Sequence, residues 1–143
     1  MTTPETPDPE SLSRLREVQA RQLGFRRRTL GPDDPGTLQS MDGLAETLHA
    51  LGDDRSAQMM LEEALTVRRA KYGAHSAETV LCAWNLFQVL WDLHATAEMR
   101  TLFERDLAWL STTDPEGLEE ELARIRASVE ELVERLDPFS GAE

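Results

Sequence analysis

Four residues of this sequence could act as a nucleophile, a general base or a soft metal ligand. They are the three histidines and the single cysteine: His49, His75, His94 and Cys82. None of them falls in a metalloprotease HExxH helix, a paired-cysteine metal site, a glycine-rich phosphate loop or a nucleophile elbow. A cysteine flanked by apolar residues, as Cys82 is, is usually buried and inert. We therefore predict a protein that is not an enzyme and that holds no metal or cofactor.

Charge and composition exclude several classes of partner. The chain of 143 residues has a net charge of −12, which disfavours nucleic acid and anionic membranes because both attract positive charge. No apolar run approaches the roughly 18 residues of a membrane span, and residues 1–10 lack the features of a signal peptide. A single cysteine cannot form an internal disulfide, as is usual in a reducing compartment. We predict a cytoplasmic protein without nucleic-acid or membrane partners.

One stretch of sequence occurs twice at a fixed distance. Residues 31–38 (GPDDPGTL) return 42 residues later as residues 73–80 (GAHSAETV). The same register relates Leu44 to Leu86 and Leu48 to Leu90 without a gap. A constant period of roughly 20 to 50 residues is typical of stacked repeats, in which no unit buries its apolar face alone.

Apolar spacing and capping signals predict helices throughout and no strand. We expect a disordered tail over residues 1–10, a helical domain over 11–136 and a loose C-terminus over 137–143. The first helix begins at the cap Ser11, and its apolar positions are Leu12, Leu15, Val18, Leu23 and Phe25. The others span about 35–51 with Asp34 as cap, 55–72, 77–93 with Ser76 as cap, 96–110 and 115–136.

Small and apolar residues stand at recurring offsets in the first full period: Leu44, Ala45, Leu48, Gly52, Ala57, Leu61 and Ala64. With these residues and the GPDxPxT loop, residues 13–110 resemble the tetratricopeptide repeat. The resemblance is to its 42-residue form, which occurs in kinesin light chains and many actinobacterial proteins. It implies an all-α, right-handed helical-hairpin solenoid of about two and a half repeats with a C-terminal capping helix. The second period departs from the family where small residues are usual, at Phe87, His94, Met99 and Asp106.

In this family the first helix of each pair, helix A, lines a concave groove, and the second is helix B. The resemblance places groove positions at Gln39, Asp42, Glu46, His49, Leu81, Trp84, Gln88, Trp91 and Asp92. Asn85 matches a family asparagine that is expected to contact the backbone of a bound peptide. The predicted function is that of an adaptor that binds a peptide or helix of another protein. The acidic groove positions favour a basic or neutral segment.

Two features leave alternatives open. Trp84 and Trp91 are seven residues apart and share one helical face. They could anchor a partner, since tryptophan is enriched at binding hot spots, or be covered by the last helix. If the groove is filled, the chain is instead a self-associating structural or regulatory subunit, a homodimer.

Arginines also cluster where two B helices end, at residues 26–28 and 68–69. They could form a strip that binds an anion. Alternatively, they complement the helix dipole and pair with nearby acids such as Asp33 or Asp34.

Overall fold

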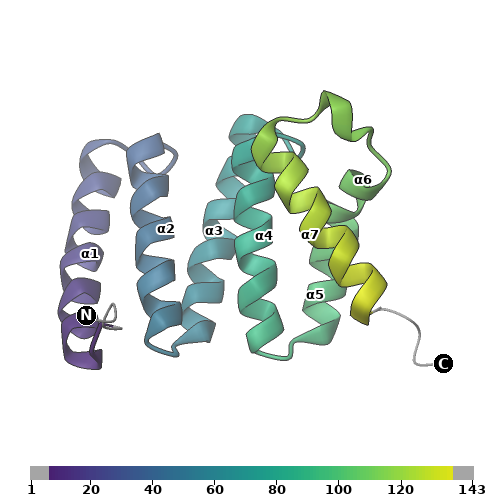
Figure 1. The fold of residues 1–143 in the computed structure, drawn as a ribbon. Helices are drawn as coiled ribbons and strands as arrows, with labels where there is room; N and C mark the ends of the chain where they lie inside the picture. The colour runs from purple at the N-terminus through teal and green to yellow at the C-terminus, as the bar shows by residue number, and fades with distance from the viewer. Residues whose placement is uncertain (1–6, 137–143) are drawn as a thin grey trace, which may run out of the picture. The chain divides into compact units, whose positions relative to one another are not determined.

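A computed structural model describes residues 7–136, and every regular element in that range is helical (Figure 1). The elements are α1 Pro9–Thr29, α2 Pro35–Ala50, α3 Asp54–Tyr72, α4 Ala77–Asp92, α5 Thr96–Leu102, the π-helical η1 Phe103–Leu107, α6 Ala108–Ser111, the 3₁₀ turn η2 Pro115–Gly117 and α7 Glu120–Leu136. The chain divides within α3, between Ala64 and Leu65, into two compact units. Residues 1–6 of the tail predicted over 1–10, and the loose end predicted over 137–143, lie outside the described residues.

In the first unit, α1 packs beside α2. The predicted cap of α2 is confirmed, because the Asp34 carboxylate accepts the Gly36 N–H and Pro35 occupies the first helical position. The predicted start of α1 is wrong. The helix begins at Pro9, because Asp8 rather than Ser11 is the cap, and residues 9 and 10 are helical rather than part of a tail. Asp8 accepts the Ser11 backbone N–H and its hydroxyl, and these bonds lower the pKa of the Asp8 carboxyl.

The apolar residues of α1 do not all lie in the core. Of the five expected positions only Leu23 is buried, and Leu12 is half-buried. Leu15, Val18 and Phe25 are exposed. The prediction of a helix was therefore correct, but its apolar residues lie on two faces. The face with Leu23 packs into the unit, and the face with Leu15, Val18 and Phe25 is exposed.

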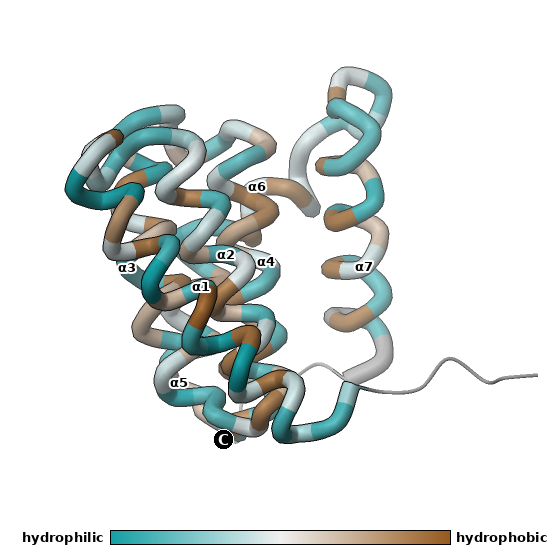
Figure 2. Tube along the Cα trace, turned by 90° about the vertical axis from the view of Figure 1, so that its left-hand side faces the viewer, coloured by the Kyte–Doolittle hydropathy of each residue, from teal (hydrophilic) through white to brown (hydrophobic). Residues whose placement is uncertain are grey.

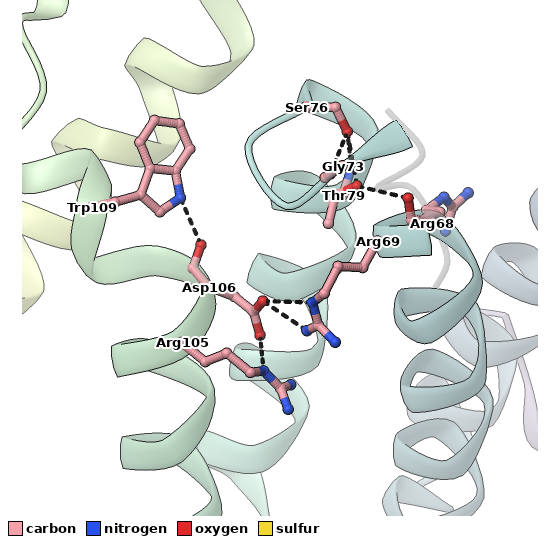
Figure 3. Close-up of polar contacts among 8 residues, drawn as sticks. All are labelled: Arg68, Arg69, Gly73, Ser76, Thr79, Arg105, Asp106 and Trp109. Atoms are coloured by element: carbon pink, nitrogen blue, oxygen red, sulfur yellow. Dashed lines mark hydrogen bonds and ion pairs between the residues drawn. The ribbon is translucent and has the colours of Figure 1, made fainter. Parts of the chain in front are cut away.

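The repeated loop has the same anchoring bond in both copies. In the first copy the Thr37 hydroxyl donates to the carbonyl oxygens of Gly31 and Arg26, at 2.7 and 3.4 Å. In the second copy the Thr79 hydroxyl donates to the carbonyl of Arg68, at 3.2 Å (Figure 3). Arg68 follows Arg26 by the same 42 residues that separate the two threonines. The repeat seen in the sequence is thus also a repeat of local structure.

In the second unit, α4 packs against α5, η1 and α7, and α6 packs against α7. Ser76 caps α4 as predicted, by accepting the Thr79 N–H. Figure 2 shows the apolar positions of α7 on one side of that helix, the side toward α4. The residues buried there are Leu122, Ile125 and Val129.

Two helices of the second unit differ from the predicted ones. The helix expected over 96–110 widens into a π-helical segment, η1, which contains Asp106 in place of the alanine of the first repeat, Ala64. The helix expected from 115 begins at Glu120. Asp114 and Pro115 instead start a 3₁₀ turn, which ends at Gly117.

The turn after α4 has a residue in an unusual backbone conformation. His94 has φ 55°, and the equivalent residue of the first repeat is Gly52, with φ 81°. A left-handed conformation costs a residue that has a Cβ about 1–2 kcal/mol. Glycine avoids this cost but loses more backbone entropy on folding, which offsets part of the gain. We expect His94→Gly to raise the free energy of unfolding by about 0.5–1 kcal/mol in urea denaturation. Gly52→His, where an added Cβ meets open space, is the matched control and should lower it. An unchanged value for both variants would contradict this explanation.

Candidate partner-binding surface

The predicted groove positions of the first repeat lie along α2 at a spacing that places them on one helical face. Gln39 and Glu46 are exposed, whereas Asp42 and His49 are half-buried. His49 is also engaged within the unit, because its Nδ1 lies 2.6 Å from Oδ1 of Asp54 at the start of α3. Gln39 and Glu46 are therefore the most accessible contacts on this helix.

The predicted positions of the second repeat form an exposed stripe along α4. Leu81, Asn85, Gln88 and Asp92 follow one another at intervals of three or four residues, and all four are exposed. The stripe combines one apolar side chain, two amides and one carboxylate. Such a surface can donate and accept hydrogen bonds along the backbone of an extended or helical segment.

Trp84 and Trp91 lie beside this stripe and are half-buried. Between them, the buried ring of Phe87 stacks on Trp84 at 5.7 Å and lies 6.4 Å from Trp91. Phe87 also contacts Phe103 of η1 at 6.4 Å. The two indoles are thus the outer edge of an aromatic cluster, and each keeps part of its surface open to solvent.

The packing of α7 against α4 bears on the two alternatives for the tryptophans. In Figure 1, α7 crosses α4 obliquely. Neither tryptophan is fully buried as a core residue would be, and neither stands free of the protein interior. A partner that reaches them would contact the part of each side chain that remains exposed, next to the polar stripe.

Equivalent positions have the same exposure in the two repeats. Gln39 and its equivalent Leu81 are exposed, whereas Asp42 and its equivalent Trp84 are half-buried. The chemistry differs at these positions although the geometry does not. Leu81 and Trp84 of the second repeat replace Gln39 and Asp42 of the first, whereas Glu46 and its equivalent Gln88 are both polar.

A buried ion cluster in the second unit was not predicted as a functional feature. Asp106 is 1% exposed, and its Oδ1 accepts the Arg69 Nη2 and Nε protons at 2.7 and 3.2 Å (Figure 3). Its Oδ2 accepts the Arg105 Nε proton at 2.8 Å. The backbone carbonyl of Asp106 accepts the Trp109 indole N–H at 3.0 Å. The signal available in the sequence was an acid at the position where the first repeat has the fully buried Ala64.

The arginine clusters are engaged within their own units. Arg26 donates to the Gly36 carbonyl and to the Ser40 hydroxyl, and Arg27 pairs with Glu63. Arg69 pairs with Asp106, as described above. Arg27 and Arg69 thus pair with acids, as in the second alternative, and these acids, Glu63 and Asp106, lie further along the chain than Asp33 and Asp34.

The residues considered for catalysis or metal binding have separate surroundings. His75 stacks on Trp109 at 4.0 Å, His94 lies in the turn that follows α4, and Cys82 is buried. Within residues 7–136, no three histidine, cysteine or carboxylate side chains gather to hold a metal ion. None of the helices described is both long enough and apolar enough to cross a bilayer.

The comparison with known proteins agrees with this geometry. Residues 16–70, which include α1, α2 and most of α3, match the family model described as tetratricopeptide repeat. This region is a tetratricopeptide repeat. Repeats of this family generally mediate protein–protein interactions. No curated protein matches the chain.

A solved structure extends the likeness beyond the tetratricopeptide region. It is described as kinesin light chain nearly identical TPR-like repeats from Podosopora anserina. The TM-score is 0.66 at 18% sequence identity, over 91% of this chain and 64% of that chain. This likeness confirms the predicted all-α, tetratricopeptide-like solenoid class. The chain spans less than two thirds of that protein.

Proposed function

We propose that the chain is a non-catalytic adaptor that binds a peptide or helix of a partner protein on its helix A surface. The observation that carries the proposal is the exposed stripe on α4, Leu81, Asn85, Gln88 and Asp92, with a tryptophan edge on one side of it. Amides at regular helical intervals suit backbone hydrogen bonding, and half-buried indoles supply apolar contact at a low entropy cost. The single cysteine supports a cytoplasmic location for this activity.

The charge of the surface indicates the chemistry of the bound segment. Each unit has carboxylates at its own proposed contact positions, Asp42 and Glu46 on α2 in the first and Asp92 on α4 in the second, and the whole chain carries −12. Complementary charge accelerates association and excludes partners of like charge. The expected partner segment is therefore basic or neutral, with an apolar residue that contacts Trp84 or Trp91.

Selection from a displayed library of random peptides tests the proposal without a known partner. We expect enrichment of basic or neutral sequences, whose synthetic peptides then lose at least about ten-fold in affinity against Asn85→Ala/Gln88→Ala. Both side chains are exposed, so the variant should retain the helical circular dichroism of the original. Glu104→Ala, an exposed residue on η1, is the control and should bind as the original does. Selected peptides that bind the Asn85/Gln88 variant with unchanged affinity would refute the proposed surface.

The alternative function is self-association through the same surface, with a second copy filling the groove. The exposed Leu81 on α4 is the observation that favours it. The apolar residues Met99 and Leu102 of α5 are buried within the chain, which leaves α4 as the candidate contact. A monomer in light scattering on a sizing column would exclude this alternative. A dimer that Leu81→Asp dissociates would replace the adaptor proposal.

A further inference from the structure

The outer face of α1 carries an apolar stripe. Leu15, Val18 and Phe25 are 45%, 60% and 59% exposed, and Gln22 lies in line with them. These four residues occupy alternating three- and four-residue steps, the spacing of the contact positions in a two-helix coiled coil. The other side of α1 carries the buried Leu23, and α1 packs against α2.

The repeat register shows what covers this face in the other helices. At the Leu15 position, the next two repeats have Ala57 and Met99, and both are buried. The second equivalent of Val18 is the buried Leu102. Met99 and Leu102 belong to α5, which packs against α4, the helix A of its own hairpin. The stripe on α1 is therefore the face that a helix B turns toward its helix A, here without a helix A in the described residues.

The charges beside the stripe determine which helix fits there. Arg14, Arg21 and Arg28 recur every seven residues along one edge of the stripe, and all three are exposed. These are the positions from which charged side chains select a partner helix in coiled coils. The whole of α1 contains six arginines and two glutamates, in a chain whose net charge is −12. The edge is thus basic although the protein is acidic, and within it Arg14 also pairs with Glu10 of the same helix.

We propose that α1 is a second docking site, distinct from the helix A surface, which binds an acidic amphipathic helix of another protein. The docked helix takes the place of a helix A. Its apolar stripe covers Leu15, Val18 and Phe25, and its carboxylates face Arg14, Arg21 and Arg28. A second copy of α1 is a poor occupant, because antiparallel pairing sets the three arginines against their own counterparts. Parallel pairing sets them against Gln19 and Arg26, which offer no negative charge.

Two synthetic amphipathic peptides test this site with the full chain. Both carry leucine at the contact positions of three heptads, and they differ only in their flanking residues, glutamate in one and lysine in the other. Non-specific attraction to a protein of charge −12 favours the lysine peptide. The proposed site instead predicts that the glutamate peptide binds at least about ten-fold more tightly in titration calorimetry.

Two variants separate the apolar from the ionic contribution. Val18→Ser/Phe25→Ser and Arg21→Glu/Arg28→Glu should each weaken binding of the glutamate peptide by at least about ten-fold. All four side chains are exposed, so circular dichroism should report an unchanged fold. Met59→Ser, an exposed apolar residue on α3, and Arg124→Glu, an exposed arginine on α7, are the matched controls and should leave binding unchanged.

Three results would overturn the proposal. Equal or tighter binding of the lysine peptide would mean that α1 does not select acidic helices. Glutamate-peptide binding that survives both α1 variants but is lost in Asn85→Ala/Gln88→Ala would assign the peptide to the helix A surface. A dimer in light scattering that Val18→Ser/Phe25→Ser dissociates would make a second copy the occupant. Failure of the helix A proposal in its own library selection would leave the α1 result unaffected.

Discussion

Replacing Arg69 with methionine is expected to lower the free energy of unfolding by about 3 kcal/mol, as removal of one partner from a buried ion pair usually does. The cause is the position of Asp106, which is 1% exposed and receives two of its hydrogen bonds from Arg69. Without Arg69, the carboxylate remains buried, and Arg105 is the ionic partner that it keeps within residues 7–136. Methionine preserves much of the apolar stem, so the loss reports the charge. Urea denaturation followed by circular dichroism measures it.

Removing the anion should cost much less than removing the cation. Arg69 and Arg105 are 28% and 51% exposed in their side chains, so both can return to water when the carboxylate is absent. Asp106→Ala also installs the residue that the first repeat has at this position, Ala64. We expect a loss of about 1 kcal/mol or less. Arg124→Met, at an exposed pair on α7, is the control and should stay within about 0.5 kcal/mol. Equal losses for Arg69→Met and Asp106→Ala would contradict this account of the cluster.

Phe87→Ala is expected to cost about 3–5 kcal/mol of unfolding free energy, the usual range for deletion of a buried aromatic ring. Phe87 is fully buried and contacts the rings of Trp84, Trp91 and Phe103. Its removal leaves a cavity at the point where α4 meets η1, and it takes away the inner support of both indoles. Tryptophan emission should therefore shift toward that of solvent-exposed indole at denaturant concentrations below the unfolding transition.

Two further variants distinguish loss of the ring from a general weakness of α4. Phe87→Leu keeps most of the apolar volume and should cost less than about 1.5 kcal/mol. Leu81→Ala, on the exposed stripe of the same helix, should stay within about 0.5–1 kcal/mol because little apolar area is uncovered there. If Phe87→Ala cost no more than Leu81→Ala, the aromatic cluster would not be the core of this unit.

The helices were predictable because period and caps are local properties of the sequence. Asp34 with Pro35 and Ser76 mark helix starts through bonds to residues two or three positions away. The same logic applied to Asp8 with Pro9, but the surrounding prolines and acids suggested a tail instead. Asp114 and Pro115 do begin a helical element, as their sequence indicates, but it is a short 3₁₀ turn. This turn ends at Gly117, and the α-helix begins only at Glu120.

The buried cluster was not predictable in the same way, because it depends on a contact between distant residues. An acid at position 106 can turn outward and stay hydrated or turn inward and find a cation. The sequence shows the departure from Ala64 but not the partner, since Arg69 precedes Asp106 by 37 residues. The π-helical segment around Asp106 has no local signature in this sequence for the same reason.

The position of the candidate surface was predictable from the sequence, but the burial of its two tryptophans was not. The seven-residue spacing of Trp84 and Trp91 determines that they share a face. The spacing does not show how far each ring is buried, because that depends on the packing around α4, where Phe87 contacts both indoles and α7 and Phe103 pack from remote parts of the sequence. The exposed stripe of α1 was missed for a related reason. Leu15, Val18 and Phe25 have the composition of a core face, and only the absence of a covering helix among residues 7–136 reveals them as surface.

The basic composition of α1 has an electrical consequence. With six arginines and two glutamates, α1 contributes +4, so the remainder of the chain carries −16 to give −12 in total. At about 0.1 M salt, charges are screened beyond about 10 Å, whereas a helix of 21 residues is about 30 Å long. A molecule that approaches the middle of α1 therefore experiences mainly the local potential of that helix. The isoelectric point and the behaviour on an ion-exchange column reflect the net charge of the whole chain. They describe neither the positive charge of α1 nor the larger negative charge of the remainder.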